Sequence, residues 1–125
     1  MSTVLIVDDQ AVVRAAVREL FESHSGFDVC GEAENGVQAI VKARELKPDL
    51  VILDLSMPLM NGLDAAKTLR QILPDVPVFL LTAHYTAATE QAALDVGICA
   101  VFSKYRGLDP IITRARAVLR PTSNV

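Results

Sequence analysis

The chain has little cysteine, no excess of positive charge and no long uninterrupted hydrophobic run. Its two cysteines, Cys30 and Cys99, lack the spacing of a metal site, and no secretory signal precedes them, so we expect buried thiols in a reducing compartment. A formal net charge of −3 gives no support for a nucleic-acid or anionic-membrane surface. Asp8, Asp54 or Thr82 interrupts the apolar runs well short of the roughly 18 residues that a membrane span needs. These absences predict a soluble, cytoplasmic protein.

The length and composition of the chain fit a single domain. Its 125 residues are near the commonest domain size, with 51% apolar and 22% charged residues, and there is no low-complexity segment. We expect residues 1–120 to form the domain and residues 121–125 to be a flexible tail or the start of a linker.

Apolar, strand-like segments alternate five times with segments of helical period. Gly and Pro lie between the segments, and Asn35 and Asn61 stand where helix N-cap residues are expected. Alternating β and α units with short connections predict an α/β fold, with a parallel sheet covered by helices on both faces. The predicted strands are 3–8, 27–32, 50–54, 77–82 and 98–103, and the predicted helices are 11–23, 36–46, 62–73, 87–96 and 108–119.

Three acidic residues fall where two of the most apolar strands end. Asp8 and Asp9 follow the run 4–7, and Asp54 follows the run 50–53. Ligands of parallel α/β sheets bind beyond the carboxyl ends of the strands, so these acids are expected to converge there. Carboxylates that converge repel one another unless a cation compensates, and Mg²⁺ prefers such hard oxygen ligands. Taken singly, each acid has a simpler interpretation as a helix-capping or turn residue.

A hydroxyl and an ammonium follow two further strands. Thr82 ends the fourth predicted strand and Lys104 follows the fifth. A hydroxyl that donates to one phosphoryl oxygen and a lysine that neutralises another suit phosphoryl transfer, with Asp54 best placed as nucleophile. Alone, either residue is ordinary, but five polar groups at the ends of four strands predict an ion and phosphoryl site.

Four parts of the sequence carry a resemblance to a known family. They are VLIVDD at 4–9, PDLVILDLSMPLMNG at 48–62, VFLLTA at 78–83, and Lys104. With these motifs, the chain closely resembles the receiver domain of two-component response regulators over residues 3–119. The segment LMNGL at 59–63 and the absence of proline after Lys104 look most like the NarL/FixJ-type subgroup of the CheY-like superfamily.

The resemblance implies a fold and a function. The fold is flavodoxin-like, a doubly wound (βα)5 sheet with strand order 2-1-3-4-5. The function is a phosphorylation-activated signalling switch that takes a phosphoryl group from a sensor histidine kinase or phosphotransfer protein and catalyses only its own transfer and autodephosphorylation. The surface of residues 86–119 would then change to control an output domain or partner, with a homodimer on phosphorylation as one option. DNA binding would belong to a downstream domain, which these 125 residues do not contain.

The resemblance also implies residue roles. Asp54 becomes the phosphoacceptor, Asp9 a direct Mg²⁺ ligand and Asp8 a mainly water-mediated one. The backbone carbonyl of Ser56 would complete the metal site. The remaining roles are a switch hydroxyl for Thr82, a phosphate-binding ammonium for Lys104, and kinase docking near Val12, Val13 and Ala16.

Three positions depart from the family pattern. Val101 replaces the Tyr or Phe that commonly rotates on activation, although Phe102 is next to it, so we expect signalling by loop displacement or helix repacking. Tyr105 replaces a frequent cis proline, so a trans peptide is expected. His84, two residues beyond Thr82, either positions water for hydrolysis of the aspartyl phosphate or points outward.

Other functional classes fit the same pattern less well. A flavin or nucleotide carrier would need a glycine-rich phosphate loop after the first strand, and the Asp8-Asp9 pair would repel its phosphate. A metal-dependent phosphatase with an aspartyl nucleophile would usually have an acid at position 56, which is Ser56. A receiver used only for docking would not need all five polar residues.

Overall fold

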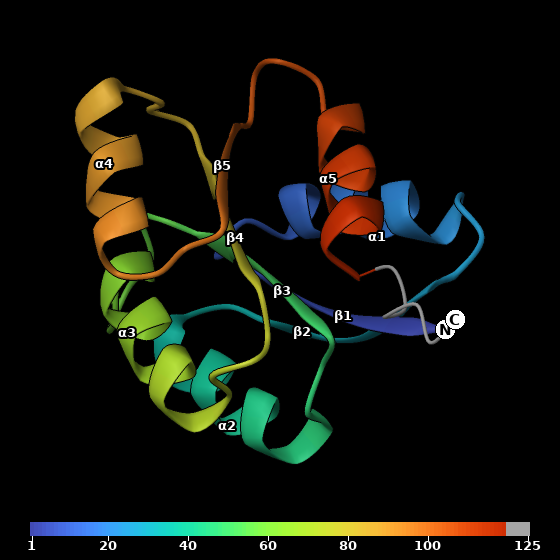
Figure 1. Cartoon of the computed structure of the whole chain (residues 1–125), viewed down its shortest axis with the longest axis horizontal. Helices are drawn as coiled ribbons and strands as arrows, with labels where there is room; N and C mark the ends of the chain where they lie inside the picture. The colour runs from blue at the N-terminus through green and yellow to red at the C-terminus, as the bar shows by residue number, and fades with distance from the viewer. Residues whose placement is uncertain (120–125) are drawn as a thin grey trace, which may run out of the picture.

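The computed structural model describes residues 1–119 as five strands and five helices in strict alternation (Figure 1). Every predicted element is confirmed, with boundaries within two residues of those expected. The predicted tail, 121–125, lies outside the described residues. The elements are β1 (Ser2–Val7), α1 (Ala11–Glu22), β2 (Phe27–Ala33), α2 (Gly36–Leu46), β3 (Leu50–Asp54), α3 (Gly62–Ile72), β4 (Val78–Thr82), α4 (Ala87–Asp95), β5 (Ala100–Ser103) and α5 (Asp109–Leu119).

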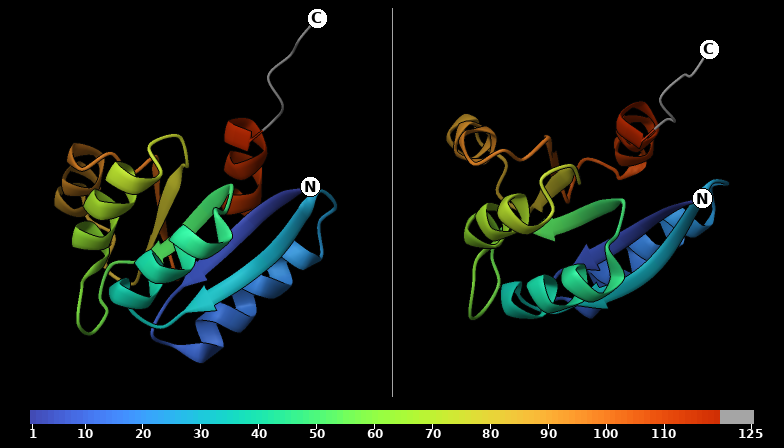
Figure 2. Two further views of the ribbon diagram at one scale, coloured as in Figure 1. Left: turned by 90° about the horizontal axis from the view of Figure 1, so that it is seen from below. Right: turned by 60° about the horizontal axis from the view of Figure 1, so that its bottom comes forward.

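All five strands pair in parallel in the order β2-β1-β3-β4-β5, which confirms the flavodoxin-like topology. The helices lie on both faces of this twisted sheet: α1 and α5 lie side by side on one face, and α2, α3 and α4 cover the other (Figures 1 and 2). Within residues 1–119, no helix is both long and apolar enough to cross a membrane.

The apolar strand runs are continuous because both faces of the sheet are buried. In β1, Val4 and Ile6 pack toward α1 and α5, whereas Leu5 and Val7 pack toward α2 and α3. The residues of β3 alternate in the same way, and all five of them are buried. Alternating side chains thus fill two separate cores, which is the expected behaviour of central parallel strands.

Polar residues are buried in a single region of the described chain. The five buried polar or charged residues each stand at, or just beyond, the carboxyl end of a different strand. One of them, Asn35, caps α2 as predicted, since its Oδ1 accepts a hydrogen bond of 2.8 Å from the amide of Gln38. Asn61 caps α3 in the same way. The other four are Asp8, Asp54, Thr82 and Ser103.

Candidate functional site

Three carboxylates converge at the carboxyl edge of the sheet. Asp8 and Asp54 are 2% and 4% exposed, whereas Asp9 is exposed at the mouth. One carboxylate oxygen from each of the three lies within 4.8 Å of the others. The sequence therefore predicted correctly that these acids are brought together. Helix capping does not explain the arrangement, because the N-cap residue of α1 is Gln10 and neither Asp8 nor Asp9.

Lys104 joins this cluster from the loop after β5. Its Nζ lies 2.8 Å from Oδ2 of Asp8 and 3.2 Å from Oδ1 of Asp54. Burial alone would lower the pKa of the lysine, but its contacts with Asp8 and Asp54 raise the pKa above its ordinary value. The side chain is therefore a fixed positive charge between two acids.

The electrostatics of Asp54 differ from those of an ordinary aspartate. Burial and the nearby charge of Asp8 raise its pKa to about 6, and the positive charge of Lys104 offsets only part of that effect. A single lysine does not fully compensate the buried negative charge. The site consequently favours a second cation.

The two carboxylate oxygens of Asp8 have different partners: one is held by a backbone amide, and the other meets the ammonium of Lys104. Its amide donates to the carbonyl of Ala33 at 3.0 Å, and its Oδ1 accepts a hydrogen bond of 2.9 Å from the amide of Gln10. Its Oδ2 is buried and, among residues 1–119, makes no hydrogen bond of good geometry; Lys104 meets it as an ion pair. A buried carboxylate oxygen without a hydrogen bond, beside two further carboxylates, has the donor chemistry that a hard divalent cation requires.

A polar cavity of about 230 Å³ opens at this cluster. Thr82, 2% exposed, forms part of its wall, and its Oγ1 accepts a hydrogen bond of 3.0 Å from the amide of His84. The Thr82 hydroxyl proton is thus not used in that bond. His84 is exposed at the rim of the cavity. The full lining consists of Asp9, Gln10, Asp54, Ser56, Thr82, Ala83, His84, Lys104 and Tyr105.

A close approach of α3 shapes the segment after Asp54. The amide of Gly62 donates to the carbonyl of Leu55 at 2.8 Å, and a Cβ at Gly62 would lie 2.3 Å from the carbonyl oxygen of Asp54. Any residue other than glycine would push α3 away from the end of β3. Ser56 follows on the exposed side, where it lines the cavity.

Two departures noted in the sequence now have a structural context. The Lys104–Tyr105 peptide is trans, as expected. Val101 is half-buried and packs against the core on the α2–α4 side, whereas Phe102 packs on the opposite face, with its ring centre 5.3 Å from that of Phe79. Since neighbouring strand residues face opposite ways, Phe102 cannot take the place of a ring at 101.

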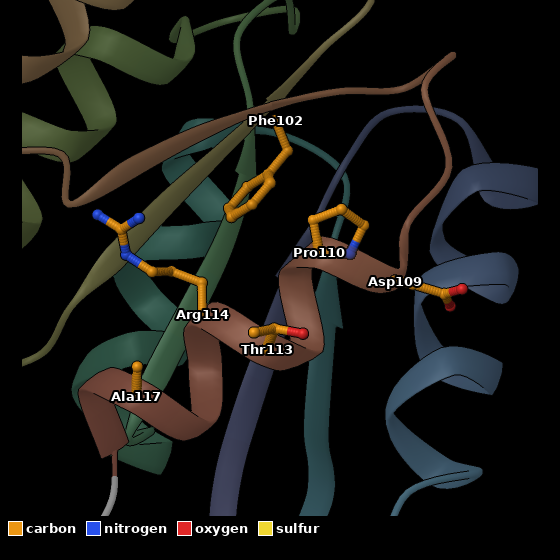
Figure 3. Close-up of a pocket in the computed structure, with 6 residues that line it drawn as sticks. All are labelled: Phe102, Asp109, Pro110, Thr113, Arg114 and Ala117. Carbon is orange, nitrogen blue, oxygen red and sulfur yellow. The ribbon is translucent and has the colours of Figure 1, made fainter.

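A second hollow, of about 470 Å³, lies away from the acids, between β5 and α5. Figure 3 shows Phe102 facing the α5 residues Pro110, Thr113 and Arg114 across it. All of its lining residues lie within 86–119, the surface predicted to respond to phosphorylation.

Sequence reasoning missed two contacts at the site. The amide of Gln10 has no signal in the sequence, because any residue there would offer the same donor. Arg14 donates from Nη1 to the carbonyl of Asp8 at 2.7 Å. The sequence carries no signal for this contact, because a charged residue early in a helix is as compatible with solvent as with a partner.

Comparison with known proteins agrees with this geometry. The family model of the response regulator receiver domain matches residues 4–116. The response regulator protein VraR of Staphylococcus aureus is 35% identical over 120 residues, which are 96% of this chain and 57% of VraR. The chain spans about half the length of the curated relatives it matches.

Solved structures share the fold. A DNA-binding response regulator of the LuxR family from Staphylococcus aureus is 25% identical, with a TM-score of 0.87 and coverage of 94% of this chain and 98% of that chain. The CheX–CheY complex with BeF3 and magnesium from Borrelia burgdorferi is 26% identical, with a TM-score of 0.86 and coverage of 94% and 88%. The match to a LuxR-family regulator, together with one to the receiver domain of the putative response regulator NarL from Mycobacterium tuberculosis, confirms the predicted NarL-type likeness.

Proposed function

Because the chain belongs to the response regulator receiver domain family, we propose that it is a phosphorylation-dependent switch of a two-component system and that Asp54 is its phosphoacceptor. One observation carries the proposal: Lys104 reaches both Asp8 and Asp54 in a polar cavity that Thr82 also lines. A histidine kinase or phosphotransfer protein would be the donor.

In this proposal each side chain has a role in the transfer. The carboxylate of Asp54 attacks phosphorus, and the bond from phosphorus to the donor nitrogen breaks. Lys104, 3.2 Å from Asp54 Oδ1, stabilises the phosphoryl oxygens, and the Thr82 hydroxyl donates to one of them. Autodephosphorylation would use the same groups with water as the nucleophile, and Ser56 and His84 at the cavity would affect its rate.

We assign a Mg²⁺ ion to the acid cluster, held by Asp8, Asp9, Asp54 and the backbone carbonyl of Ser56. The buried Oδ2 of Asp8 and the mutual proximity of the three carboxylates support this assignment. When bound, Mg²⁺ neutralises charge on the transferring phosphoryl oxygens. A solved relative, the Borrelia burgdorferi CheY, is described with BeF3 and magnesium.

The output would run through the loops after β4 and β5 to the surface of residues 86–119. These loops already contact each other, because the Arg106 guanidinium lies 5.8 Å from the centre of the Tyr85 ring. The Tyr85 hydroxyl in turn donates to Glu90 of α4. A displacement at Thr82 or Lys104 would therefore have a route of side-chain contacts to α4, without a ring at position 101.

The partners follow from the same proposal. Kinase docking is assigned to the start of α1, where Val12 is 77% exposed beside Asp9, Val13 is half-buried and Ala16 is exposed. An output domain would belong to a longer protein, and the solved LuxR-family relative is described as a DNA-binding response regulator. Homodimerisation would be one form of output. We place the domain in the cytoplasm, consistent with the two free cysteines, which are half-buried rather than fully buried as expected.

The experiment is phosphorylation with acetyl phosphate, followed by intact mass and peptide mapping. The chain should gain about 80 Da, the mass of one phosphoryl group, at Asp54 when Mg²⁺ is present, and should gain nothing with a chelator. An adduct that maps elsewhere would contradict the assignment of Asp54. An adduct that forms equally well in the chelator would contradict the assignment of the metal.

Coupling is tested separately with Lys104→Ala. Amide NMR spectra of the Mg²⁺ form and the beryllofluoride form are compared, beryllofluoride standing in for the phosphoryl group. The wild type should show shifts across residues 83–106, and the variant should lose most of them. Shifts as large as those of the wild type would show that Lys104 does not couple the site to the surface.

A further inference from the structure

Arg14 of α1 connects the acid cluster to the neighbouring strand. Its Nη1 donates to the backbone carbonyl of Asp8 at 2.7 Å, and its Nε donates to Oε1 of Glu32 in β2 at 2.9 Å. The side chain is only 14% exposed. The guanidinium of Arg14 therefore ties the loop that carries Asp8 and Asp9 to Glu32, which is fixed on the sheet.

Glu32 is well anchored as that fixed point. Its other carboxylate oxygen accepts from Nε of Arg18 at 2.7 Å, and its backbone carbonyl accepts from Nζ of Lys42 in α2 at 2.6 Å. Burial would raise the pKa of Glu32, but the hydrogen bonds and charges of Arg18 and Arg14 lower it below its ordinary value. The carboxylate is therefore ionised and oriented by both arginines.

The carbonyl that Arg14 binds has a specific importance. The ladders of β1 end at Val7, which pairs with Ala33 and Leu53, so the carbonyl of Asp8 lies beyond the last paired residue. That carbonyl belongs to the peptide bond between Asp8 and Asp9. Because a peptide unit is planar, a fixed carbonyl direction also fixes the direction from which the exposed Asp9 leaves the sheet.

We propose that Arg14 is a positioning residue for the divalent-cation site: it fixes the peptide between Asp8 and Asp9 and thereby aims the Asp9 carboxylate at the cluster. This inference rests on the proposed function, since it deepens the role given there to Asp9. Arg14 itself contacts neither the cation nor the phosphoryl group. Groups that orient metal ligands typically contribute 10–100-fold to metal affinity.

Arg18 provides a matched control. It is the same residue type on the same helix and shares Glu32 with Arg14, but its other partner is Glu22, at 3.1 Å, rather than a carbonyl of the site. Arg14→Gln and Arg18→Gln remove the same charge and the same kind of ion pair. Only the first of them releases Asp8.

Loss of the Arg14 charge and loss of its positioning role predict opposite changes in the affinity for the cation. Removing a positive charge near an acidic cluster should strengthen the binding of a cation through Coulomb attraction. Loss of positioning should weaken it. A weaker affinity in Arg14→Gln therefore cannot come from the change in net charge.

The experiment is a Mg²⁺ titration of the folded chain, followed at the amides of residues 8–10 and 54–56 by NMR, for the wild type and three variants. Arg14→Gln should bind Mg²⁺ about tenfold more weakly, whereas Arg18→Gln should bind as tightly as the wild type or slightly more tightly. Arg14→Lys keeps the charge and one donor, and should recover part of the affinity. The metal-free melting temperatures of the two glutamine variants should be similar, because each loses its ion pair with Glu32 and one further contact, to Glu22 for Arg18 and to the Asp8 carbonyl for Arg14.

The outcomes separate the two proposals. A wild type whose amides at 8–10 and 54–56 do not respond to Mg²⁺ overturns the metal assignment in the proposed function. A wild type that binds Mg²⁺, with Arg14→Gln equal to Arg18→Gln, overturns only the role of Arg14. If Arg14→Gln does not fold, Arg14→Lys against Arg18→Lys decides, and equal affinities in that pair overturn the inference.

Discussion

Asp49 precedes β3 and Asp54 is its last residue, yet the two lie in opposite environments. Asp49, at the amino edge, is exposed, and its Oδ2 accepts hydrogen bonds from the amide of Thr3 at 2.8 Å and from its hydroxyl at 3.2 Å. Asp54, at the carboxyl edge, is buried beside Asp8, and its pKa is raised to about 6.

The difference follows from the polarity of parallel strands. At the amino edge, strands begin with N–H groups that stabilise a carboxylate directly. At the carboxyl edge, strands end with carbonyl oxygens, which cannot donate a hydrogen bond to a carboxylate. Carboxylates gathered there therefore depend on a cation or on the amides of the following loops. A carboxylate is therefore stabilised by the backbone at one edge and lacks that stabilisation at the other. The predictions below test this contrast, from the largest expected effect to the smallest.

The largest effect is on phosphoryl uptake. Asp54→Asn should abolish the gain of about 80 Da from acetyl phosphate, because an amide of nearly equal volume replaces the nucleophilic oxygen. Asp49→Asn should leave uptake unchanged, since Asp49 lies at the other end of the strand. Intact mass spectrometry measures both variants. Phosphoryl uptake retained in Asp54→Asn would show that Asp54 is not the acceptor and that the two edges do not differ in function.

Lysines at the two edges should differ in their contribution to stability. Lys104→Ala leaves Asp8 and Asp54 facing each other without a counter-charge, so the metal-free free energy of unfolding should fall by about 2–4 kcal/mol. Lys47→Ala, at an exposed position before β3, should change it by less than about 0.5 kcal/mol. Urea denaturation in a chelator and in Mg²⁺ measures this, and Mg²⁺ should restore part of the loss in Lys104→Ala.

The pH dependence of metal-free stability should report Asp54. Its folded pKa of about 6 lies above the unfolded value of about 3.9, so the folded chain binds the proton more tightly and metal-free stability should fall as the pH rises from 4 to 6. The shift corresponds to roughly 3 kcal/mol, which screening by water at the cavity reduces to about 1–2 kcal/mol.

Variants at the two aspartates isolate this contribution. Asp54→Asn should remove that fall and be about 1–2 kcal/mol more stable than the wild type at pH 7, whereas Asp49→Asn should keep the fall. Denaturation curves at intervals from pH 4 to 7 give the comparison. A fall of equal size in wild type and Asp54→Asn would assign it to another group.

The smallest effect concerns backbone strain, which occurs once near each edge. Lys47, with φ of 46°, ends α2, and Leu59, with φ of 70° and 81% exposure, lies in the loop after Asp54. Replacing either with glycine should stabilise the fold by about 0.5–1 kcal/mol, because glycine adopts this conformation without a Cβ clash. Only Leu59→Gly should also change the phosphorylation rate. Equal rates would show that the strained loop does not influence the site.

The sequence predicted the elements and the five converging polar groups because both depend on local patterns. Strand runs buried on both faces are continuous, and polar residues at their ends must meet in a parallel sheet. The order of the strands could not be predicted in this way, since alternating β and α units permit several orders and only the resemblance selected one. The register shift between Val4 and Leu5, which places Cys30 between their partners, has no local signature.

Side-chain contacts between loops were also beyond the sequence. The link from Arg106 to Tyr85, and the one from Arg14 to Asp8, join residues whose approach is set by the packing of whole elements. A charged residue on a helix is equally compatible with solvent or with a partner until that packing is known.

The position of Lys104 also has a consequence for how the chain folds. The three acids all lie within the first 54 residues, but their counter-charge follows β5, which is the last strand in the sequence and one edge of the sheet. In a partly folded chain with β5 detached, the acids at the ends of β1 and β3 repel each other, which penalises that intermediate. Docking of the edge strand relieves the repulsion. The lysine thus ties the last strand to the first and favours all-or-none folding over a stable fragment.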